Sequence, residues 1–248
     1  MVMITREFVG RRNAFQRLIQ EVIVAGAVEI RDIERGEKPF LYSSGNWGPG
    51  YISIKGLGGR AKATLKALTL WLAAEIAERT ESIDFVAGNV SGGMIPGWEL
   101  SEYLEILLRK EIPFVYIRDT RKKGGQRELV TGLPSPKILS GSRGIDVEEL
   151  VNFAETTCHG VSALRAAGCR VNHAACILFY ENPEAIKALR EADVEMVSLF
   201  TLTEMLDVLE RSHMYEKRLL DEWREWREDP FQWQTQRGLT PVAEGGTK

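Results

Sequence analysis

The sequence is poor in the residues that hold small folds together or ligate metals. It has three cysteines and three histidines in 248 residues. The cysteines, Cys158, Cys169 and Cys176, are odd in number, and none lies in a CxxC pair. These features argue against a disulfide framework or a zinc knuckle and fit a reducing compartment.

Long apolar runs and a strong net charge are also missing. No segment approaches the ~20 consecutive apolar residues that span a bilayer, and the first residues hold no apolar stretch long enough for a signal peptide. The formal net charge of -3 gives no argument for nucleic-acid binding. We therefore expect a cytoplasmic protein with no nucleic-acid or membrane partner.

Three common signatures of nucleotide-binding and hydrolytic enzymes do not occur in the chain. It has no Walker P-loop, no dinucleotide fingerprint and no nucleophile elbow. With 248 residues, of which 44% are apolar, it is long enough for one large α/β domain with or without an appendage.

What the sequence does contain is a regular alternation of strand and helix patterns. Apolar runs typical of buried strands alternate with stretches whose apolar residues recur at helical intervals. We expect helices at 11–25, 62–80, 98–111, 156–167 and 182–192, strands at 83–87, 112–119, 144–150, 169–180 and 194–202, and two short strands around a glycine-rich turn within 39–57. This order predicts an α/β fold with a mostly parallel sheet flanked by helices on both faces.

The character of the chain changes after about Thr203. Residues 203–229 read as one or two charged amphipathic helices, and the last residues as a disordered end. The sequence thus predicts a domain at 1–210 and a helical C-terminal extension at 211–248. Four aromatic residues of the extension are expected to pack it onto the domain or a partner chain rather than to bind a ligand: Trp223, Trp226, Phe231 and Trp233.

Two loops after predicted strands are candidates for anion binding, because ligands of open α/β sheets lie beyond the carboxyl ends of the strands. Ser91, Gly92 and Gly93 follow the strand at 83–87, where glycines either cradle an anion or only permit a tight turn. Residues 118–127 carry five cations and one carboxylate. This basic loop is either a solvated surface loop or a lid over a polyanionic substrate.

A third candidate is the carboxylate pair Glu148 and Glu149 at the end of the strand at 144–150. Two such side chains could hold ribose hydroxyls directly or through a divalent cation. Taken alone, two glutamates near the start of a helix would only stabilise its positive end. Their position after a strand and before a loop into a helix favours a role in binding.

These strings, taken in order from about residue 10 to residue 210, resemble the type I phosphoribosyltransferases, and among them the orotate phosphoribosyltransferases. The strings that carry the resemblance are FLYSSGNWGPGYISIKGL, VAGNVSGGMIP, IPFVYIRDTRKKGGQRELVTG, DVEELVNFAETTCHGVSALRAAGCRV and VSLFTLTEML. The resemblance implies a five-stranded parallel core with an N-terminal hood, often in a homodimer. It also implies a reaction in which a nucleobase displaces pyrophosphate from phosphoribosyl diphosphate (PRPP), with Mg²⁺ as cofactor.

The resemblance also implies roles for individual residues. Glu148 and Glu149 would hold the ribose hydroxyls, and Ser91, Gly92 and Gly93 would line the pyrophosphate loop. The catalytic residues would be Lys122 and Arg118, which would neutralise the leaving group.

The loop that should receive the 5′-phosphate departs from the family pattern. The family has threonines and glycines there, whereas this chain has Asn152, Phe153, Ala154 and Glu155, and only Thr156 keeps a hydroxyl. A like-charge contact at ~4 Å costs on the order of 4 kcal/mol at an effective dielectric near 20. We therefore expect a bulky Phe153 and an anionic Glu155 to oppose a phosphate, although Asn152 and Thr156 remain candidate substrate contacts.

A second departure concerns the base. The arginine that contacts the carboxylate of orotate in the family aligns with Glu181. Two hypotheses stay open: a phosphoribosyltransferase whose base is not orotate, and a non-catalytic homologue that binds a ligand or a partner.

Overall fold

The computed structural model describes residues 2–80, 82–118 and 129–242, and the chain divides into two compact units. The first unit contains the residues up to Thr64, the short segment Glu181–Pro183 and the residues from Phe200 onward. The second unit contains Leu65–Tyr180 and Glu184–Leu199. The predicted boundary near residue 210 stays a prediction.

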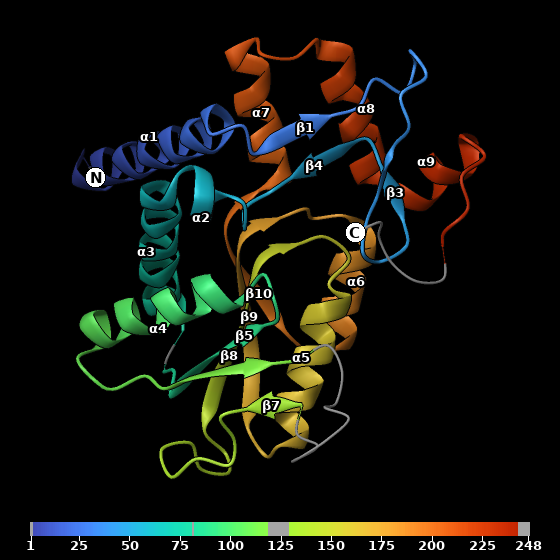
Figure 1. The fold of residues 1–248 in the computed structure, drawn as a ribbon. Coiled ribbons are helices and arrows are strands. Elements are labelled where there is room, and N and C mark those ends of the chain that lie inside the picture. Colours follow the sequence, from blue (N-terminus) through green and yellow to red (C-terminus); the bar gives the residue numbers. More distant parts are fainter. Residues whose placement is uncertain (1, 81, 119–128, 243–248) are drawn as a thin grey trace. The chain divides into compact units, whose positions relative to one another are not determined.

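A six-stranded sheet, in the order β10-β9-β8-β5-β6-β7, forms the centre of the second unit (Figure 1). The pairs β5–β6, β5–β8 and β8–β9 are parallel, and β7 runs antiparallel to β6. The strands are β5 (Phe85–Asn89), β6 (Phe114–Ile117), β7 (Val130–Thr131), β8 (Arg143–Val151), β9 (Arg170–Phe179) and β10 (Glu195–Thr201). The expected mostly parallel sheet is confirmed, whereas the two-residue β7 was missed because it carries no recognisable period.

Helices cover both faces of this sheet. Figure 1 shows α3 and α4 on one face and α5 and α6 on the other. Their bounds are α3 (Lys62–Arg79), α4 (Met94–Leu108), α5 (Glu155–Ala166) and α6 (Pro183–Glu191). All five residues of β5 are buried, and the strand begins with the apolar residues Phe85, Val86 and Ala87 because a strand covered on both faces has no side in contact with water.

The strand order creates a switch point in the middle of the sheet. From β5 the chain proceeds outward through α4 to β6, and the later strands β8, β9 and β10 add to the opposite side of β5. Connections that leave a strand in opposite directions open a crevice at its carboxyl end, which is where ligands of such sheets bind. A ligand is therefore expected at the carboxyl ends of β5 and β8.

The first unit is built from short strands and helices. Two antiparallel pairs, β1 with β4 and β2 with β3, lie in the N-terminal part. The elements are α1 (Val2–Val24), β1 (Val28–Ile30), β2 (Phe40–Leu41), β3 (Trp47–Gly48), β4 (Gly50–Ile52), α2 (Leu57–Arg60), α7 (Leu202–Ser212), α8 (Lys217–Glu228) and α9 (Pro230–Gln236). The extension thus contains α8 and α9, and the last residues, 243–248, lie outside the described part of the chain.

The tryptophans of the extension belong to the core of the first unit. Trp223, Trp226 and Trp233 are at most 1% exposed, whereas Phe231 is 42% exposed. The indole N–H of Trp226 donates to the backbone oxygen of Trp47 at 2.8 Å. The expected packing role is confirmed for the three tryptophans and stays a prediction for Phe231.

Residues of α9 and of the segment after it form hydrogen bonds with Asn46 and Trp47, at the start of β3. Gln234 is buried, accepts the backbone N–H of Trp47 at 2.8 Å and donates to Asn46 Oδ1 at 3.3 Å. The indole N–H of Trp47 donates to the carbonyl of Thr240 at 2.9 Å. The N-terminal hairpin therefore obtains several of its hydrogen-bond partners from residues almost two hundred positions later.

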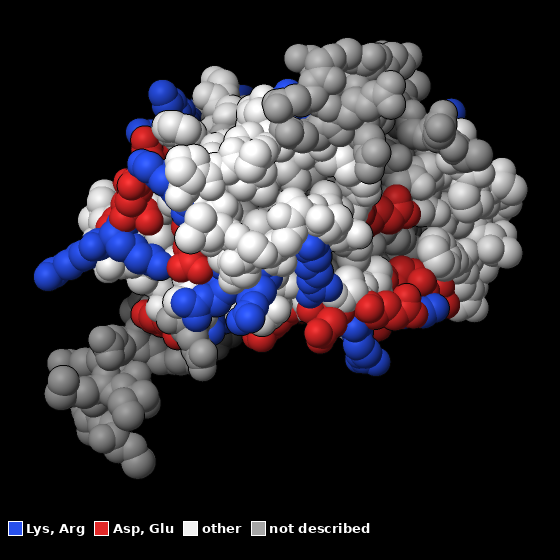
Figure 2. Space-filling model, turned by 90° about the horizontal axis from the view of Figure 1, so that it is seen from below, with Lys and Arg blue, Asp and Glu red and all other residues white. Residues whose placement is uncertain are grey.

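On the face seen in Figure 2, charged side chains of both signs lie along the lower margin, next to a broad uncharged area. In the part of the chain that the structure describes, no helix is long and apolar enough to cross a membrane.

We predict that Trp226→Ala lowers the free energy of unfolding of the first unit by about 3–5 kcal/mol, because it removes a fully buried indole and its hydrogen bond. Phe231→Ala, a change in the same extension at a 42% exposed ring, should cost less than about 1 kcal/mol. Urea unfolding of both variants checks this. Equal costs would show that the buried indoles do not hold this unit together.

Candidate active site

Three strands bring the candidate residues of the second unit to one edge of the sheet. Asn89, the last residue of β5, lies beside Ile117, the last residue of β6, and Gly88 lies beside Val147 of β8. The loop after β5, the residue after β6 and the carboxylates of β8 therefore lie at the same edge of the sheet. The structure brings together the Ser91–Gly93 loop, Arg118, Glu148 and Glu149, which the sequence had placed on separate strands.

The glycines of the β5–α4 loop are required by close backbone contacts. A Cβ atom on Gly93 would overlap the carbonyl oxygen of Val147, and one on Gly92 would overlap the carboxylate of Glu149. The N–H of Gly93 donates to the carbonyl of Asn89 at 2.9 Å, which turns the loop back over the sheet. Ser91 is exposed beside them. The loop is thus pressed against β8, and the Glu149 carboxylate covers Gly92.

Glu148 and Glu149 form a carboxylate pair. Glu148 is 8% exposed, and the neighbouring Glu149 is half-buried. Burial raises the pKa of Glu148 well above its usual value, and the neighbouring charge of Glu149 raises it further. The pair therefore places two carboxylates, which are oxygen ligands of the kind that divalent cations prefer, next to each other at the edge of the sheet.

This pair fits a Mg²⁺ ion that is also held by its substrate. Mg²⁺ usually binds one or two carboxylates and completes its shell with substrate phosphates and water. Among the described residues no cluster of three or more acidic, histidine or cysteine side chains could hold a metal. Two carboxylates leave most positions of a Mg²⁺ shell to phosphates and water.

A buried polar pair that the sequence analysis missed lies beneath the site. The amide nitrogen of Asn89 donates to both carboxylate oxygens of Asp146, at 3.0 and 2.9 Å, and both residues are at most 2% exposed. Burial raises the pKa of Asp146 well above its usual value, although the bond to Asn89 opposes that shift. An aspartate inside an apolar strand was the signal that could have identified it.

The pair also fixes how closely α5 approaches the sheet. A Cβ atom on Gly160 of α5 would come within 2.6 Å of Asn89 Oδ1 and of Asp146 Oδ1. Only glycine leaves room for the helix at this point. The polar pair thus positions the helix that follows the loop at 152–154.

The loop between β8 and α5 keeps a glycine-like backbone without a glycine. Ala154 has φ 63° and ψ 11°, a left-handed conformation, and it is 4% exposed within the apolar core of this unit. A non-glycine residue pays about 1–2 kcal/mol for such a backbone. Burial of the alanine methyl therefore helps to keep a conformation that glycine adopts freely.

The side chains that flank Ala154 differ in how far they are exposed to solvent. Phe153 is 7% exposed, and Asn152 is half-buried. Glu155 and Thr156, the first residues of α5, are exposed. Within residues 2–80, 82–118 and 129–242 the structure gives Glu155 no ion-pair partner, so its charge meets any anion that approaches the start of α5.

Arg118 follows β6 directly, and its guanidinium lies 5.7 Å from the centre of the Tyr116 ring. Its backbone N–H donates to the carbonyl of Leu129 at 3.0 Å, which joins the two ends of the basic loop. Lys122, the other predicted catalytic residue, lies outside the described residues. The roles of both residues stay predictions.

Glu181, the residue aligned with the family's orotate-binding arginine, belongs to the first unit. Its carboxylate accepts a hydrogen bond from Thr203 Oγ1 at 3.2 Å and lies 4.0 Å from Arg227 Nη1. The charge at this position is thus partly compensated by a cation of the C-terminal extension, a partner that alignment with the family could not have indicated.

We predict that Asp146→Asn makes stability less dependent on pH. The folded protein binds a proton on Asp146 that the unfolded chain has released, so the free energy of unfolding falls as pH rises from about 4 toward the raised pKa. The variant should remove up to about 1.4 kcal/mol per pH unit of that fall. Urea unfolding between about pH 5 and pH 8 measures the slope. The exposed Asp193→Asn should retain the parent slope, and an unchanged slope in Asp146→Asn would contradict the prediction.

We further predict that Ala154→Gly changes the free energy of unfolding by less than about 1 kcal/mol, because relief of the left-handed backbone offsets the lost methyl burial. Ala163→Gly removes a methyl from the same core cluster but inside α5. It should cost about 2 kcal/mol, since glycine is also a poor helix former. Thermal or urea unfolding compares the two. A larger loss for Ala154→Gly than for Ala163→Gly would disprove the strain argument.

Comparison with known proteins shows which proteins the chain is similar to. No family model matches the chain. The chain is 29% identical over 203 residues to an orotate phosphoribosyltransferase of Bacteroides fragilis, an alignment that covers 79% of this chain and 88% of the relative. It is 28% identical over 225 residues to the orotate phosphoribosyltransferase of Phocaeicola vulgatus, with 88% of this chain and 98% of the relative covered.

Solved structures show the same fold. The crystal structure of orotate phosphoribosyltransferase from Aeropyrum pernix matches with a TM-score of 0.60 at 24% identity, over 80% of this chain and 99% of that chain. The UMP synthase of Leishmania donovani matches with a TM-score of 0.67 at 17% identity over 87% of this chain. The match spans only 42% of that longer protein. The chain has the type I phosphoribosyltransferase fold and is a homologue of the orotate phosphoribosyltransferases.

Proposed function

We propose that the chain is a Mg²⁺-dependent phosphoribosyltransferase that transfers the phosphoribosyl group of PRPP to a nucleobase other than orotate. The observation that supports this most directly is the convergence of the Gly92–Gly93 loop, Arg118 and the Glu148–Glu149 pair on one edge of the sheet. Homologues named orotate phosphoribosyltransferase support the reaction class.

In the proposed reaction a base nitrogen forms a bond to C1 of the ribose while the bond from C1 to the pyrophosphate oxygen breaks. The leaving pyrophosphate takes the electron pair, and the base nitrogen loses its proton if it carries one. Positive charge develops on the sugar and negative charge on the leaving oxygen. Catalysis would therefore consist mainly of positioning and of electrostatic stabilisation.

The residues of the edge suit these tasks. Glu148 and Glu149 would accept hydrogen bonds from the ribose hydroxyls, and the backbone of Ser91, Gly92 and Gly93 would approach the pyrophosphate. Bound Mg²⁺ would neutralise the charge of the pyrophosphate. Because the Glu149 carboxylate covers Gly92, it must turn toward the sugar or the ion before pyrophosphate can enter.

Arg118 and Lys122 would supply the positive charge that meets the departing pyrophosphate. Arg118 lies at the base of the loop that carries four further cations. Asn152 and Thr156 would contact the 5′-phosphate with the backbone N–H groups at the start of α5, a helix end that attracts anions.

The charge of Glu181 is the reason for proposing a base other than orotate. An anionic side chain stands at the position aligned with the family's carboxylate-binding arginine, and Arg227 compensates its charge only at 4.0 Å. A nucleobase with a hydrogen-bond donor suits this residue better than one with a carboxylate. We also propose a cytoplasmic homodimer, as the resemblance to the family implies.

One observation favours a second function. Glu155 is exposed at the start of α5 and, in the described part of the chain, has no ion-pair partner. Such a charge opposes the dianionic phosphate of PRPP. The second candidate is therefore a non-catalytic homologue that binds a ligand or a partner protein.

A single experiment tests the transferase and separates it from the second candidate. We predict that PRPP with Mg²⁺ binds the parent chain in calorimetry and that Glu155→Gln binds about three- to tenfold tighter, because a solvent-screened like charge is removed. Addition of a panel of nucleobases should then release pyrophosphate with at least one base that lacks a carboxylate.

Glu184→Gln is the matched control. Glu184 is likewise an acidic residue in the first turn of a helix of the second unit, but it belongs to α6. It should leave PRPP affinity unchanged. If neither the parent nor Glu155→Gln releases pyrophosphate with any base, the transferase proposal is wrong. Binding of PRPP by the variant alone would favour a homologue that has lost this substrate.

A further inference from the structure

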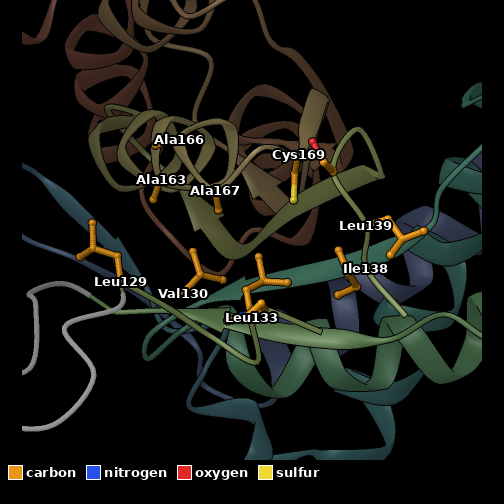
Figure 3. A pocket seen from close by; sticks show the side chains of 11 residues that line it. Leu129, Val130, Leu133, Ile138, Leu139, Ala163, Ala166, Ala167 and Cys169 are labelled. Carbon is orange, nitrogen blue, oxygen red and sulfur yellow. The ribbon is translucent and has the colours of Figure 1, made fainter. Parts of the chain in front are cut away.

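A recess in the second unit lies at the end of α5 opposite to the residues discussed above. Its volume is about 470 Å³, within the range of small-molecule sites. Figure 3 shows Ala163 and Ala166 of α5, and Ala167 directly after it, on one side and the side chains of Leu129, Val130 and Leu133 on the other. The lining residues are Leu129, Val130, Leu133, Pro134, Ile138, Leu139, Ser140, Ala163, Ala166, Ala167 and Cys169.

The recess exists because α5 presents small side chains to a loop that is held away from it. Ala163, Ala166 and Ala167 leave space where larger residues would contact the opposite wall. The N–H of Gly141 donates to the carbonyl of Gly168 at 2.8 Å, and this bond ties the far end of the loop to the end of the helix. A recess therefore remains open between the loop and the alanines.

The chemistry of the walls selects an uncharged ligand. None of the lining residues carries a charged side chain, and the only side-chain polar groups are the Ser140 hydroxyl and the Cys169 thiol. Burial raises the pKa of Cys169, so the thiol is also uncharged. A charged group placed there would lose its hydration without gaining a partner.

The rim shows apolar surface that is still in contact with water. Leu139 is 66% exposed beside the recess, whereas Ile138, its neighbour in the lining, is 6% exposed. A ligand that fills the recess would cover Leu139 together with the alanine methyl groups. Such burial contributes roughly 25 cal/mol per Å² of apolar surface.

We propose that this recess is a second binding site, distinct from the carboxyl edge of the sheet, for a small uncharged apolar molecule such as a single or fused aromatic ring. Its size, its lack of charge and its exposed apolar rim match this class of ligand. Ser140 supplies one hydrogen-bond donor or acceptor for a polar substituent.

The recess is joined to the carboxyl edge by backbone hydrogen bonds. Val130 of the lining pairs with Ile117, and the carbonyl of Leu129 accepts the N–H of Arg118 at 3.0 Å. A ligand that packs on Leu129 and Val130 would steady this pair of strands. Occupancy of the recess should therefore protect the Arg118 N–H from exchange with solvent.

The test uses indole as an uncharged probe and indole-3-acetate as its charged analogue, added to the full chain and followed by amide NMR. Indole should shift the amide signals of Leu129, Val130 and Ala167 and slow hydrogen exchange at Arg118. Indole-3-acetate should bind about tenfold more weakly or worse, because its carboxylate has no partner in the recess.

Two variants of α5 provide the comparison. Ala166→Leu fills the recess from the helix and should reduce indole affinity by about tenfold or more. Ser162→Leu adds a similar side chain at an exposed position of the same helix outside the lining, and it should leave indole affinity unchanged. Undiminished binding by Ala166→Leu would overturn the proposal. So would equal affinity for the charged analogue, or a concentration-dependent dimer that Ala166→Leu abolishes, since a second copy would then be the occupant.

Discussion

The organisation of this protein depends on acidic side chains placed on a strand that is buried on both faces. β8 lies in the interior of the sheet and carries Asp146, Glu148 and Glu149. Desolvation makes such groups costly unless each finds a proton or a hydrogen-bond donor. Asp146 receives the amide of Asn89, and burial together with the charge of Glu149 raises the pKa of Glu148, which favours its protonated form. These partners constrain what can surround the strand.

Much of the neighbouring geometry follows from that constraint. Asn89 must stand at the end of β5 to reach Asp146, and α5 needs Gly160 to pass over the pair. The loop after β5 needs Gly92 and Gly93 because it is pressed against the Glu149 carboxylate and the Val147 carbonyl. The glycines, the amide and the carboxylates are therefore one arrangement, and a change at one of them would disturb the others.

The sequence was sufficient to predict the order of the long elements. Periodicity identified α3, α4, α5 and α6, because each is an amphipathic or buried helix of at least nine residues. It could not identify β1 or β7, with three and two residues, since so short a segment shows no period. The position of Gly92, Gly93, Glu148 and Glu149 at one edge of the sheet could be predicted because parallel strands end at a common edge, whereas their roles stay predictions.

The parts that escaped prediction depend on contacts between distant residues. The hydrogen bond from Asn89 to Asp146 spans 57 positions, and that from Trp226 to Trp47 spans 179. Neither is visible in a local pattern. The C-terminal tryptophans looked like a surface for packing, but only the structure shows that Trp47 accepts a bond from one of them and that Gln234 completes the same turn.

The start of α5 shows how a binding loop can change its chemistry while keeping its backbone. Ala154 adopts the left-handed conformation that a glycine would adopt freely, and its methyl group is buried in the core. The first N–H groups of a helix, together with the helix dipole, attract an anion. The negative charge of Glu155, the first residue of the helix, repels an anion at the same helix end. In the proposed function, the affinity of this loop for phosphate therefore depends on the exposed Glu155 side chain, while the backbone is retained.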